Sequence, residues 1–193
     1  MKTRVFLLVV VFLTISACNV QAEIIWDSGH HEFSEGSEGE VWLLNNATAD
    51  ITGGYIGNLL CYDISSVDTY DGSDIDFLKP LDTSVVNIHG GTVNILAARN
   101  SSNIYLYDGS LNIIDAMAES TVTLYVETYD WEPTGGQFQD GLLTGTWLAS
   151  GAGFNIELLG PDTFGHILLV PEPSSITLFV IGSLIVRRSR RKK

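Results

Sequence analysis

Apolar and polar residues alternate with a period of two in short stretches through the middle of this chain. Val86-Asn87-Ile88 and Ile104-Tyr105-Leu106 are examples, and glycine, serine or asparagine residues lie close to each. Successive side chains of a β-strand point to opposite faces, and β-branched and aromatic residues favour strands. Runs of Ala, Leu, Glu and Lys, which are typical of helices, are nearly absent. The pattern therefore predicts short β-strands joined by turns.

The strand pattern recurs at a fixed interval. A serine stands at every eighteenth position in one part of the chain: Ser66, Ser84, Ser102 and Ser120. Two residues after each serine we expect an inward-facing column of Asp68, Val86, Ile104 and Val122. Two residues further on we expect a second column of Tyr70, Ile88, Leu106 and Leu124. Asp68 fits an inward column poorly, and it belongs to the first of these units.

Further apolar columns follow a glycine-containing turn in each repeat. The first consists of Ile56, Ile75, Val93 and Leu111. The second, three residues later, consists of Leu59, Leu78, Leu96 and Ile114. The first step in both columns is 19 residues instead of 18, and we place the extra residue near Asp74.

A single repeat of this kind cannot bury its apolar side chains, whereas stacked repeats bury them in continuous ladders. We therefore predict an all-β fold in which residues 40–126 form a small parallel β-solenoid of four to five coils, each of about 18 residues. An antiparallel β-sandwich also has short strands at regular spacing and is the alternative. The recurrence of individual Ser, Gly and apolar positions favours the solenoid.

The segments on either side of the repeats differ from them in composition. Residues 23–39 contain a Gly-, Ser- and Glu-rich stretch, and we predict a flexible segment there. Residues 127–169 leave the period but keep alternating pieces, and we predict a cap of three or four antiparallel strands. Such a cap would block edge-to-edge pairing of the last coil, with Trp131 and Trp147 supplying large buried area.

The first 22 residues have the features of a secretory signal peptide. A basic start, Met1 to Arg4, precedes an unbroken apolar run from Val5 to Leu13. Val20-Gln21-Ala22 then gives a cleavage site before Glu23. Ile15-Ser16-Ala17-Cys18 also fits a lipobox, and in that alternative Cys18 is lipidated.

The last residues form a tail of three parts. Val170-Pro171-Glu172-Pro173 precedes an apolar run, Ile176 to Val186, which is shorter than the roughly 20 residues that span a bilayer as a helix. Six of the last seven residues are basic, which would hold the end at the cytoplasmic face. We predict a short transmembrane-like helix that serves as a transient anchor.

This tail resembles the PEP-CTERM sorting signal of Gram-negative-type bacteria. The matching positions are Pro171, Glu172, Pro173, Arg187, Arg188, Arg190 and Arg191. The resemblance implies that an exosortase-type enzyme cuts a membrane-tethered precursor, whose body then reaches the cell envelope or extracellular matrix. Short exported proteins with this tail also carry repeats similar to Gly90-Gly91-Thr92-Val93-Asn94-Ile95-Leu96, a phrase that is general to β-solenoids.

The charge of the body is far more negative than that of the whole chain. The full sequence has a formal net charge of −13, but eight of its ten basic residues lie in the two terminal segments. Between Glu23 and Val170 the basic residues are Lys79 and Arg99, against 22 Asp and Glu. This balance excludes nucleic acid as a partner and disfavours anionic polysaccharides unless divalent cations bridge the charges.

The ionisable residues of the body do not form a recognisable catalytic motif. A polysaccharide lyase would need Lys79 or Arg99 as its base, and neither has an identifiable carboxylate cluster around it. A hydrolase would need facing carboxylates, for which stacking of coils could use Asp63, Asp82 or Glu119. Cys61 lies among apolar neighbours and is predicted to be a buried small hydrophobe.

Two fragments carry metal-ligating side chains. Asp71, Asp74 and Asp76 lie in an acidic turn whose oxygen atoms suit calcium, although the spacing is not that of an EF-hand. A solvated acidic turn is the favoured interpretation, and we predict no resident cofactor. His30-His31-Glu32 is the second fragment.

The sequence therefore predicts an exported, non-catalytic protein of the cell surface or matrix. Its predicted partners are the exosortase-type enzyme, transiently the cytoplasmic membrane, and exopolysaccharide. A carbohydrate-binding or adhesive module that presents Tyr105, Tyr107 and Tyr125 is the first alternative. A lyase or hydrolase acting on matrix polysaccharide is the second.

Overall fold

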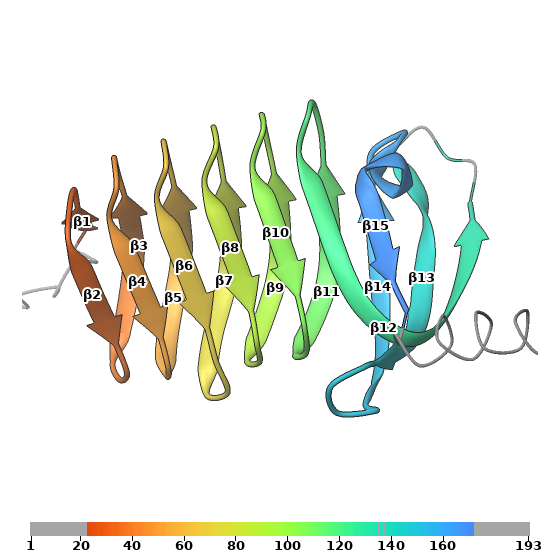
Figure 1. The fold of residues 1–193 in the computed structure, drawn as a ribbon, viewed down its shortest axis with the longest axis horizontal. Coiled ribbons are helices and arrows are strands. Elements are labelled where there is room, and N and C mark those ends of the chain that lie inside the picture. The colour runs from red at the N-terminus through yellow and green to blue at the C-terminus, as the bar shows by residue number, and fades with distance from the viewer. Residues whose placement is uncertain (1–22, 135, 137, 172–193) are drawn as a thin grey trace, which may run out of the picture.

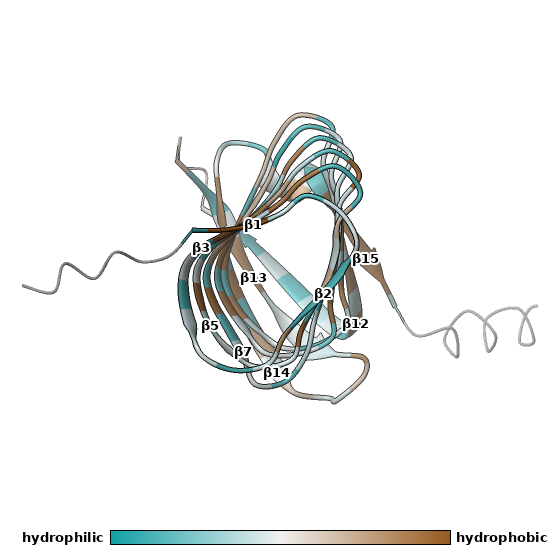
Figure 2. Cartoon of the chain, turned by 90° about the vertical axis from the view of Figure 1, so that its left-hand side faces the viewer, coloured by the Kyte–Doolittle hydropathy of each residue, from teal (hydrophilic) through white to brown (hydrophobic). Residues whose placement is uncertain are grey.

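The protein is an all-β solenoid of about six turns, described by a computed structural model for residues 23–134, 136 and 138–171 (Figure 1). Fifteen strands form one continuous set of hydrogen-bonded neighbours that folds into two facing sheets. Seen along the stack, the coils lie over one another around a common interior (Figure 2). The predicted parallel β-solenoid is confirmed, and the sandwich alternative is wrong.

Each coil gives one strand to each sheet. Sheet A takes β1 (Glu23–Trp26), β3 (Ser37–Leu43), β5 (Gly54–Cys61), β7 (Ser73–Pro80), β9 (Thr92–Ala98) and β11 (Ser110–Ala116). Sheet B takes the shorter strands β2 (His30–Phe33), β4 (Thr48–Ile51), β6 (Ser66–Thr69), β8 (Val85–Ile88) and β10 (Asn103–Leu106). Within both sheets these strands pair in parallel with the strand one coil away.

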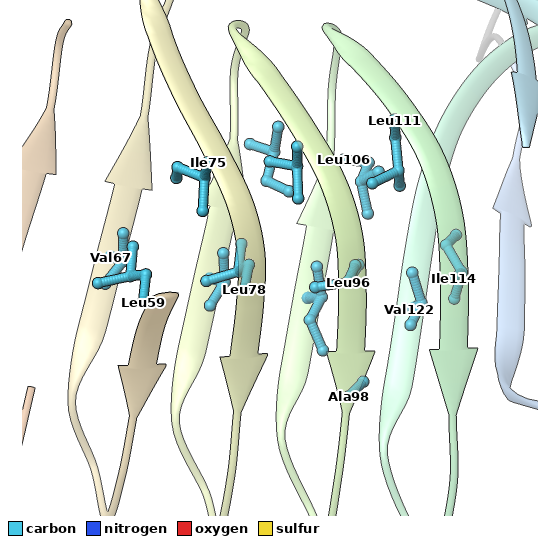
Figure 3. Packing of buried hydrophobic residues seen from close by; sticks show 14 of the residues in the cluster. Leu59, Val67, Ile75, Leu78, Leu96, Ala98, Leu106, Leu111, Ile114 and Val122 are labelled. Carbon is cyan, nitrogen blue, oxygen red and sulfur yellow. The ribbon is translucent and has the colours of Figure 1, made fainter. Parts of the chain in front are cut away.

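The apolar columns predicted for sheet A lie in register and face the interior. Ile56 pairs with Ile75 and Ile75 with Val93, and the column from Leu59 to Ile114 stacks in the same way. All eight side chains of these columns are at most 4% exposed. Figure 3 shows Ile75, Leu78 and Leu96 filling the space between the sheets. Because equivalent side chains meet across each strand pair, the ladders bury apolar surface continuously along the axis.

The columns predicted for sheet B are correct for three coils and wrong for the coil that contains Ser66. Ser66 pairs with Val85, so the buried serine column is Ser65, Ser84, Ser102 and Ser120. Val67 and Thr69 face inward in that coil, whereas Asp68 and Tyr70 face outward. The turn after β6 has three residues, Tyr70 to Gly72, where the turn after β4 has two. Counting by 18 across this longer turn shifts the assignment by one residue, which exchanges the two faces of a strand.

Residues 23–39 differ from the predicted flexible segment. They form β1, β2 and the beginning of β3, and they pair with the coil that follows. The glycines of this stretch serve turns, because Gly29 and Gly36 have φ values of 83° and 101°, which favour glycine. The solenoid therefore begins at Glu23 instead of residue 40, and it has more coils than predicted.

One corner of the solenoid is a stack of residues in the left-handed conformation. Their φ values lie between 53° and 63°, and the residues are Asn45, Asp63, Asp82, Asn100 and Ala118. Asn and Asp tolerate this conformation better than other residues with a Cβ atom. The Asn45 amide donates to the Asp63 carboxylate at 3.0 Å, and the Asp63 amide donates to Asp82 at 3.3 Å. The carboxylates of Asp63 and Asp82 thus link this corner of one coil to the same corner of the preceding coil.

The C-terminal cap joins the two sheets. Strand β12 (Thr121–Pro133) starts in sheet B beside β10, then crosses to sheet A and pairs antiparallel with β13 (Gln139–Trp147). Strand β13 pairs antiparallel with β14 (Gly153–Leu159), and β14 returns to pair in parallel with β11. After the 3₁₀ helix η1 (Thr163–His166), β15 (Ile167–Val170) pairs in parallel with β12. The predicted antiparallel strands are present, but two of the cap's strand pairings are parallel.

Among residues 23–134, 136 and 138–171, no helix is long and apolar enough to cross a membrane. The predicted signal peptide 1–22 and the predicted anchor helix lie outside the described residues, as do Cys18, Glu172, Pro173, Arg187, Arg188, Arg190 and Arg191. Pro171 directly follows β15 and is exposed.

Candidate functional site

The outward side of sheet B carries the most regular arrangement of polar and aromatic side chains. In β8 and β10 the first and third residues are partly exposed, and the second and fourth are buried. The residue after each strand is also exposed or partly exposed, so each coil presents three outward positions. We call this surface the outer face of sheet B.

Four aromatic rings stack along one edge of this face. They belong to the residues after β6, β8 and β10 and to the equivalent residue of β12: Tyr70, His89, Tyr107 and Tyr125. The centroids of neighbouring rings are 5.2, 4.7 and 4.5 Å apart, with interplanar angles of 15°, 5° and 11°. We call these four residues the aromatic ladder. Each stacked pair is typically worth about 0.5–1.5 kcal/mol beyond the apolar area that it buries.

His89 connects the aromatic ladder to the neighbouring column. Its Nε2 atom lies 3.4 Å from Oδ1 of Asp68, and its ring lies between those of Tyr70 and Tyr107. Asp68 is outward because the side chains of β6 alternate, with Val67 and Thr69 buried, so this contact depends on the register of that coil.

Tyr70 and Tyr107 of the aromatic ladder are uncharged at ordinary pH. Burial raises the pKa of Tyr107 above its usual value, and the neighbouring Tyr125 phenol raises it further. Burial also raises the pKa of Tyr70, with added contributions from the Asp68 and Asp50 carboxylates. Both phenols therefore keep their protons and act as neutral hydrogen-bonding groups.

The central column of the outer face changes character along the axis. Glu32, Asp50 and Asp68 lie in register on β2, β4 and β6. The same column continues with Asn87, Tyr105 and Thr123 on β8, β10 and β12. The outer face thus has an acidic half on β2, β4 and β6 and a half without charged carboxylates, lysine or arginine on β8, β10 and β12.

The predicted metal fragment His30-His31-Glu32 lies at the start of the acidic half. His30 Nε2 is 3.6 Å from Asp50 Oδ2 and 4.0 Å from Glu32 Oε1, whereas His31 stacks on Trp26. Like charges on adjacent strands repel, and the His30 ring lies within 4.0 Å of both carboxylates.

The acidic turn predicted as a calcium candidate is not gathered into a site. Asp71 lies in the turn after β6, whereas Asp74 and Asp76 lie on β7, where Asp76 accepts a hydrogen bond from the Tyr55 hydroxyl. Within the part of the chain that the structure describes, no group of three His, Cys, Asp or Glu side chains is arranged to hold a metal ion. Calcium binding stays a prediction.

The two basic residues of the body lie away from the outer face of sheet B. The Arg99 guanidinium contacts Oδ2 of Asp115 at 2.5 Å and donates to the carbonyl oxygens of Asp115 and Ala98. Lys79 lies on β7, in register with Leu60 of sheet A. An arginine bound in this way is poorly suited to abstract a proton from a substrate.

Cys61 is fully buried in the core, which confirms its predicted place among apolar residues. Burial raises the pKa of its thiol to about 12, so the thiol is unreactive in the folded protein.

A shallow apolar hollow lies between the end of sheet A and the cap. Its lining residues are Asp115, Met117, Phe138, Leu159, Gly160 and Pro161. Among the lining residues that the structure describes, the ionisable side chain is that of Asp115, whose Oδ2 atom is bound to Arg99. The hollow therefore lacks the convergent polar groups that orient a small-molecule substrate.

No family model matches this sequence, and no curated protein or solved structure is significantly similar to it. The functional argument therefore rests on the residues and their geometry.

Sequence reasoning named Tyr105, Tyr107 and Tyr125 as surface candidates but did not place Tyr70 and His89 beside them. The signal was present, because Tyr70, His89, Tyr107 and Tyr125 are separated by steps of 19, 18 and 18 residues. This spacing was not recognised as an outward column because Tyr70 was assigned to an inward one.

Proposed function

We propose that this chain is an exported, non-catalytic protein of the cell envelope or extracellular matrix. Residues 1–22 direct export, and the PEP-CTERM-like tail tethers the precursor to the cytoplasmic membrane. An exosortase-type enzyme then cuts near Pro171 and Pro173, which removes the basic end and leaves a strongly acidic body. This proposal rests on the two terminal patterns and on the form of the body between them.

The observation that carries the non-catalytic part of the proposal is the uninterrupted stacking of the coils. Register is kept across every strand pair from β2 to β12 in sheet B. A stack in which each coil contacts its neighbours gives long, rigid side faces, which suit contact with an extended partner. The engagement of Arg99 by Asp115 counts against the lyase alternative.

Analysis of the termini of the extracellular form tests the proposal. The full chain would be expressed in a bacterium that has an exosortase, and mass spectrometry would identify both ends of the protein outside the cell. We expect an N-terminus at Glu23 and loss of the segment from Arg187 to Lys193. An extracellular form that keeps this basic segment would contradict the proposal.

A paired substitution separates the motif from a general effect of losing proline. Pro171→Ala with Pro173→Ala is expected to leave the precursor in the membrane fraction. Pro161→Ala, at an exposed position of the cap, is the matched control and is expected to be processed like the wild type. Equal processing of all three forms would show that the motif is not read.

A further inference from the structure

The half of the outer face of sheet B on β8, β10 and β12 is an unusual surface for so acidic a body. Its nine outward positions are Val85, Asn87, His89, Asn103, Tyr105, Tyr107, Thr121, Thr123 and Tyr125. They include no Asp, Glu, Lys or Arg, although the body has 22 acidic residues. All are partly or well exposed except Thr123, which is 5% exposed. We call this surface the neutral face.

The chemistry of the neutral face suits an uncharged, hydroxyl-rich ligand. Its side chains combine aromatic rings with amides and hydroxyls, which supply apolar contact and adaptable hydrogen bonds together. The acidic half beside it, with Glu32, Asp50 and Asp68 in register, repels polyanions from the same sheet. A cationic partner would be drawn to those carboxylates instead of the neutral face.

The geometry of the rings gives the central column and the aromatic ladder different roles in binding. Tyr107 has His89 at 4.7 Å on one side and Tyr125 at 4.5 Å on the other, so its ring faces are covered and its edge and hydroxyl remain. Tyr105 lies in the central column between Asn87 and Thr123, outside the aromatic ladder. Tyr105 is therefore the ring of this face that a ligand can stack on, while the ladder supplies a row of polar groups.

These groups repeat along the solenoid axis at the spacing of the coils. A ligand with regularly spaced hydroxyls can lie across β8, β10 and β12 and meet an equivalent side chain at each strand. A single small molecule would use only one coil of the row, which favours a chain-like ligand.

We propose that the neutral face binds a neutral polysaccharide chain lying across β8, β10 and β12, with Tyr105 as the stacking residue and the Tyr107 hydroxyl as a hydrogen-bonding group. The inference deepens the proposed function, and it rests on that function in so far as an exported protein meets such a polymer. The binding itself can be measured whether or not the tail is processed.

Direct binding to glycans of known charge tests the inference. The full chain, purified in mild detergent, would be applied to an array of neutral glucans, mannans, galactans and N-acetylglucosamine polymers together with uronate polymers. We expect binding to at least one neutral polymer and weaker or no binding to the uronates. Absence of binding to every neutral polymer, by a protein with a cooperative thermal transition, would overturn the inference.

Three substitutions locate the site. Tyr105→Ala is expected to weaken the affinity at least about tenfold, as loss of a central aromatic contact does in other interfaces. Tyr107→Phe keeps the stacked ring and removes the hydroxyl, so it is expected to weaken binding severalfold without disturbing the fold. Tyr129→Ala is the matched control, because Tyr129 is 53% exposed on β12 beyond sheet B.

The three forms also keep the test decisive if one of them fails to fold. Should Tyr105→Ala lose its thermal transition, Tyr107→Phe still reports on the neutral face. The assignment would be overturned if folded Tyr105→Ala and Tyr107→Phe both bound with wild-type affinity. It would also be overturned if Tyr129→Ala lost as much affinity as these two variants. Sedimentation velocity adds another outcome: a dimer that Tyr105→Ala dissociates would make this face a contact between two copies and would also overturn it.

Processing and binding fail in distinguishable ways. An extracellular form with an intact basic tail removes the proposed sorting but leaves the glycan result standing. A correctly processed form that binds none of the neutral polymers removes only the inference about the neutral face.

Discussion

The regular coils and the C-terminal cap solve the same packing problem in different ways. In the coils each buried side chain meets its equivalents from the neighbouring repeats, as Leu78 does between Leu59 and Leu96. In the cap, β12 leaves sheet B, crosses the end of the stack and returns through antiparallel pairs. The coils thus use one local solution many times, whereas the cap needs contacts that occur once.

The difference follows from the exposed edges of a stacked fold. Any coil offers unpaired backbone groups to a further strand, and without a cap the last coil would invite association with other chains. The cap places β13 and β14 against sheet A and β15 against sheet B. Its single-use contacts are large aromatic ones, including the Trp131–Phe164 stack with centroids 4.3 Å apart.

The largest expected effect concerns the principal anchor of the cap. Trp147 is 1% exposed, packs on Phe154, and donates from Nε1 to the Gly109 carbonyl oxygen at 2.8 Å. Trp147→Ala is expected to lower the free energy of unfolding by about 3–5 kcal/mol, because it leaves a large cavity and an unpaired carbonyl. Urea unfolding followed by circular dichroism measures the change.

Leu96→Ala in a central coil is the partner of this experiment. We expect this substitution to lower the free energy of unfolding by about 2–5 kcal/mol. Unfolding should remain one cooperative transition, since the neighbours of Leu96 lie in two adjacent coils. If Trp147→Ala lowers the free energy of unfolding by less than Leu96→Ala does, the cap does not depend on this anchor.

A second comparison sets a turn of the coils against a turn of the cap. Gly91 and Gly151 both have positive φ values, 84° and 70°. A Cβ atom on Gly91 would lie 2.8 Å from the carbonyl oxygens of Ser73 and Tyr70, whereas one on Gly151 would meet nothing within 4 Å. Gly91→Ala is therefore expected to lower the free energy of unfolding by roughly 2–5 kcal/mol, because conformational strain and overpacking add together.

Gly151→Ala carries the conformational strain alone, and we expect a loss of about 1–2 kcal/mol. Thermal unfolding of the two variants under identical conditions gives the difference. Equal losses would mean that neighbouring coils yield readily at the turn, contrary to the close stacking described above.

The smallest expected effect lies where the coils meet the cap. The corner stack of left-handed residues ends at Ala118, whose φ is 63°, and alanine is poorly suited to that conformation. Ala118→Gly is expected to stabilise the protein by about 0.5–1 kcal/mol, after allowance for the greater freedom of glycine in the unfolded chain. Differential scanning calorimetry would detect the rise in Tm.

Ala152→Gly is the control for this prediction. Ala152 is exposed and is not among the residues with positive φ, so glycine there brings no relief of strain. We expect a small loss of stability, and a gain equal to that of Ala118→Gly would contradict the explanation.

Much of the fold could be predicted because its dominant signal is local. The columns ending at Leu111 and Ile114 were assigned correctly, since apolar side chains at a fixed step must stack to be buried. The burial of Cys61 followed from its apolar neighbours. The strands around Trp147 and Ile156 were also predicted from alternation, although their pairing partners were not.

The errors have two physical sources. Residues 23–39 looked flexible because polar and glycine-rich sequences often are, but in a solenoid the next coil supplies the hydrogen-bonding partner. The coil of Ser66 was misread because one extra residue in the turn from Tyr70 to Gly72 changes the step, and period-2 strands reverse their faces on a shift of one.

The candidate surface shows the same division. Tyr105, Tyr107 and Tyr125 were recognised as outward residues, because each neighbours an apolar position in an alternating strand. The aromatic ladder and the contact between His89 and Asp68 were not recognised, since they join residues from different coils.

The sequence by itself determined the repeat, the inward apolar columns, the acidity of the body and the two terminal patterns. These are properties of composition and of neighbours along the chain. The tertiary structure decided which outward side chains meet, where the first coil begins and how the last one is closed. Neighbours on the outer face of sheet B are 18 or 19 residues apart, so one residue added to a turn changes which positions meet across that turn while leaving the local pattern of each strand intact.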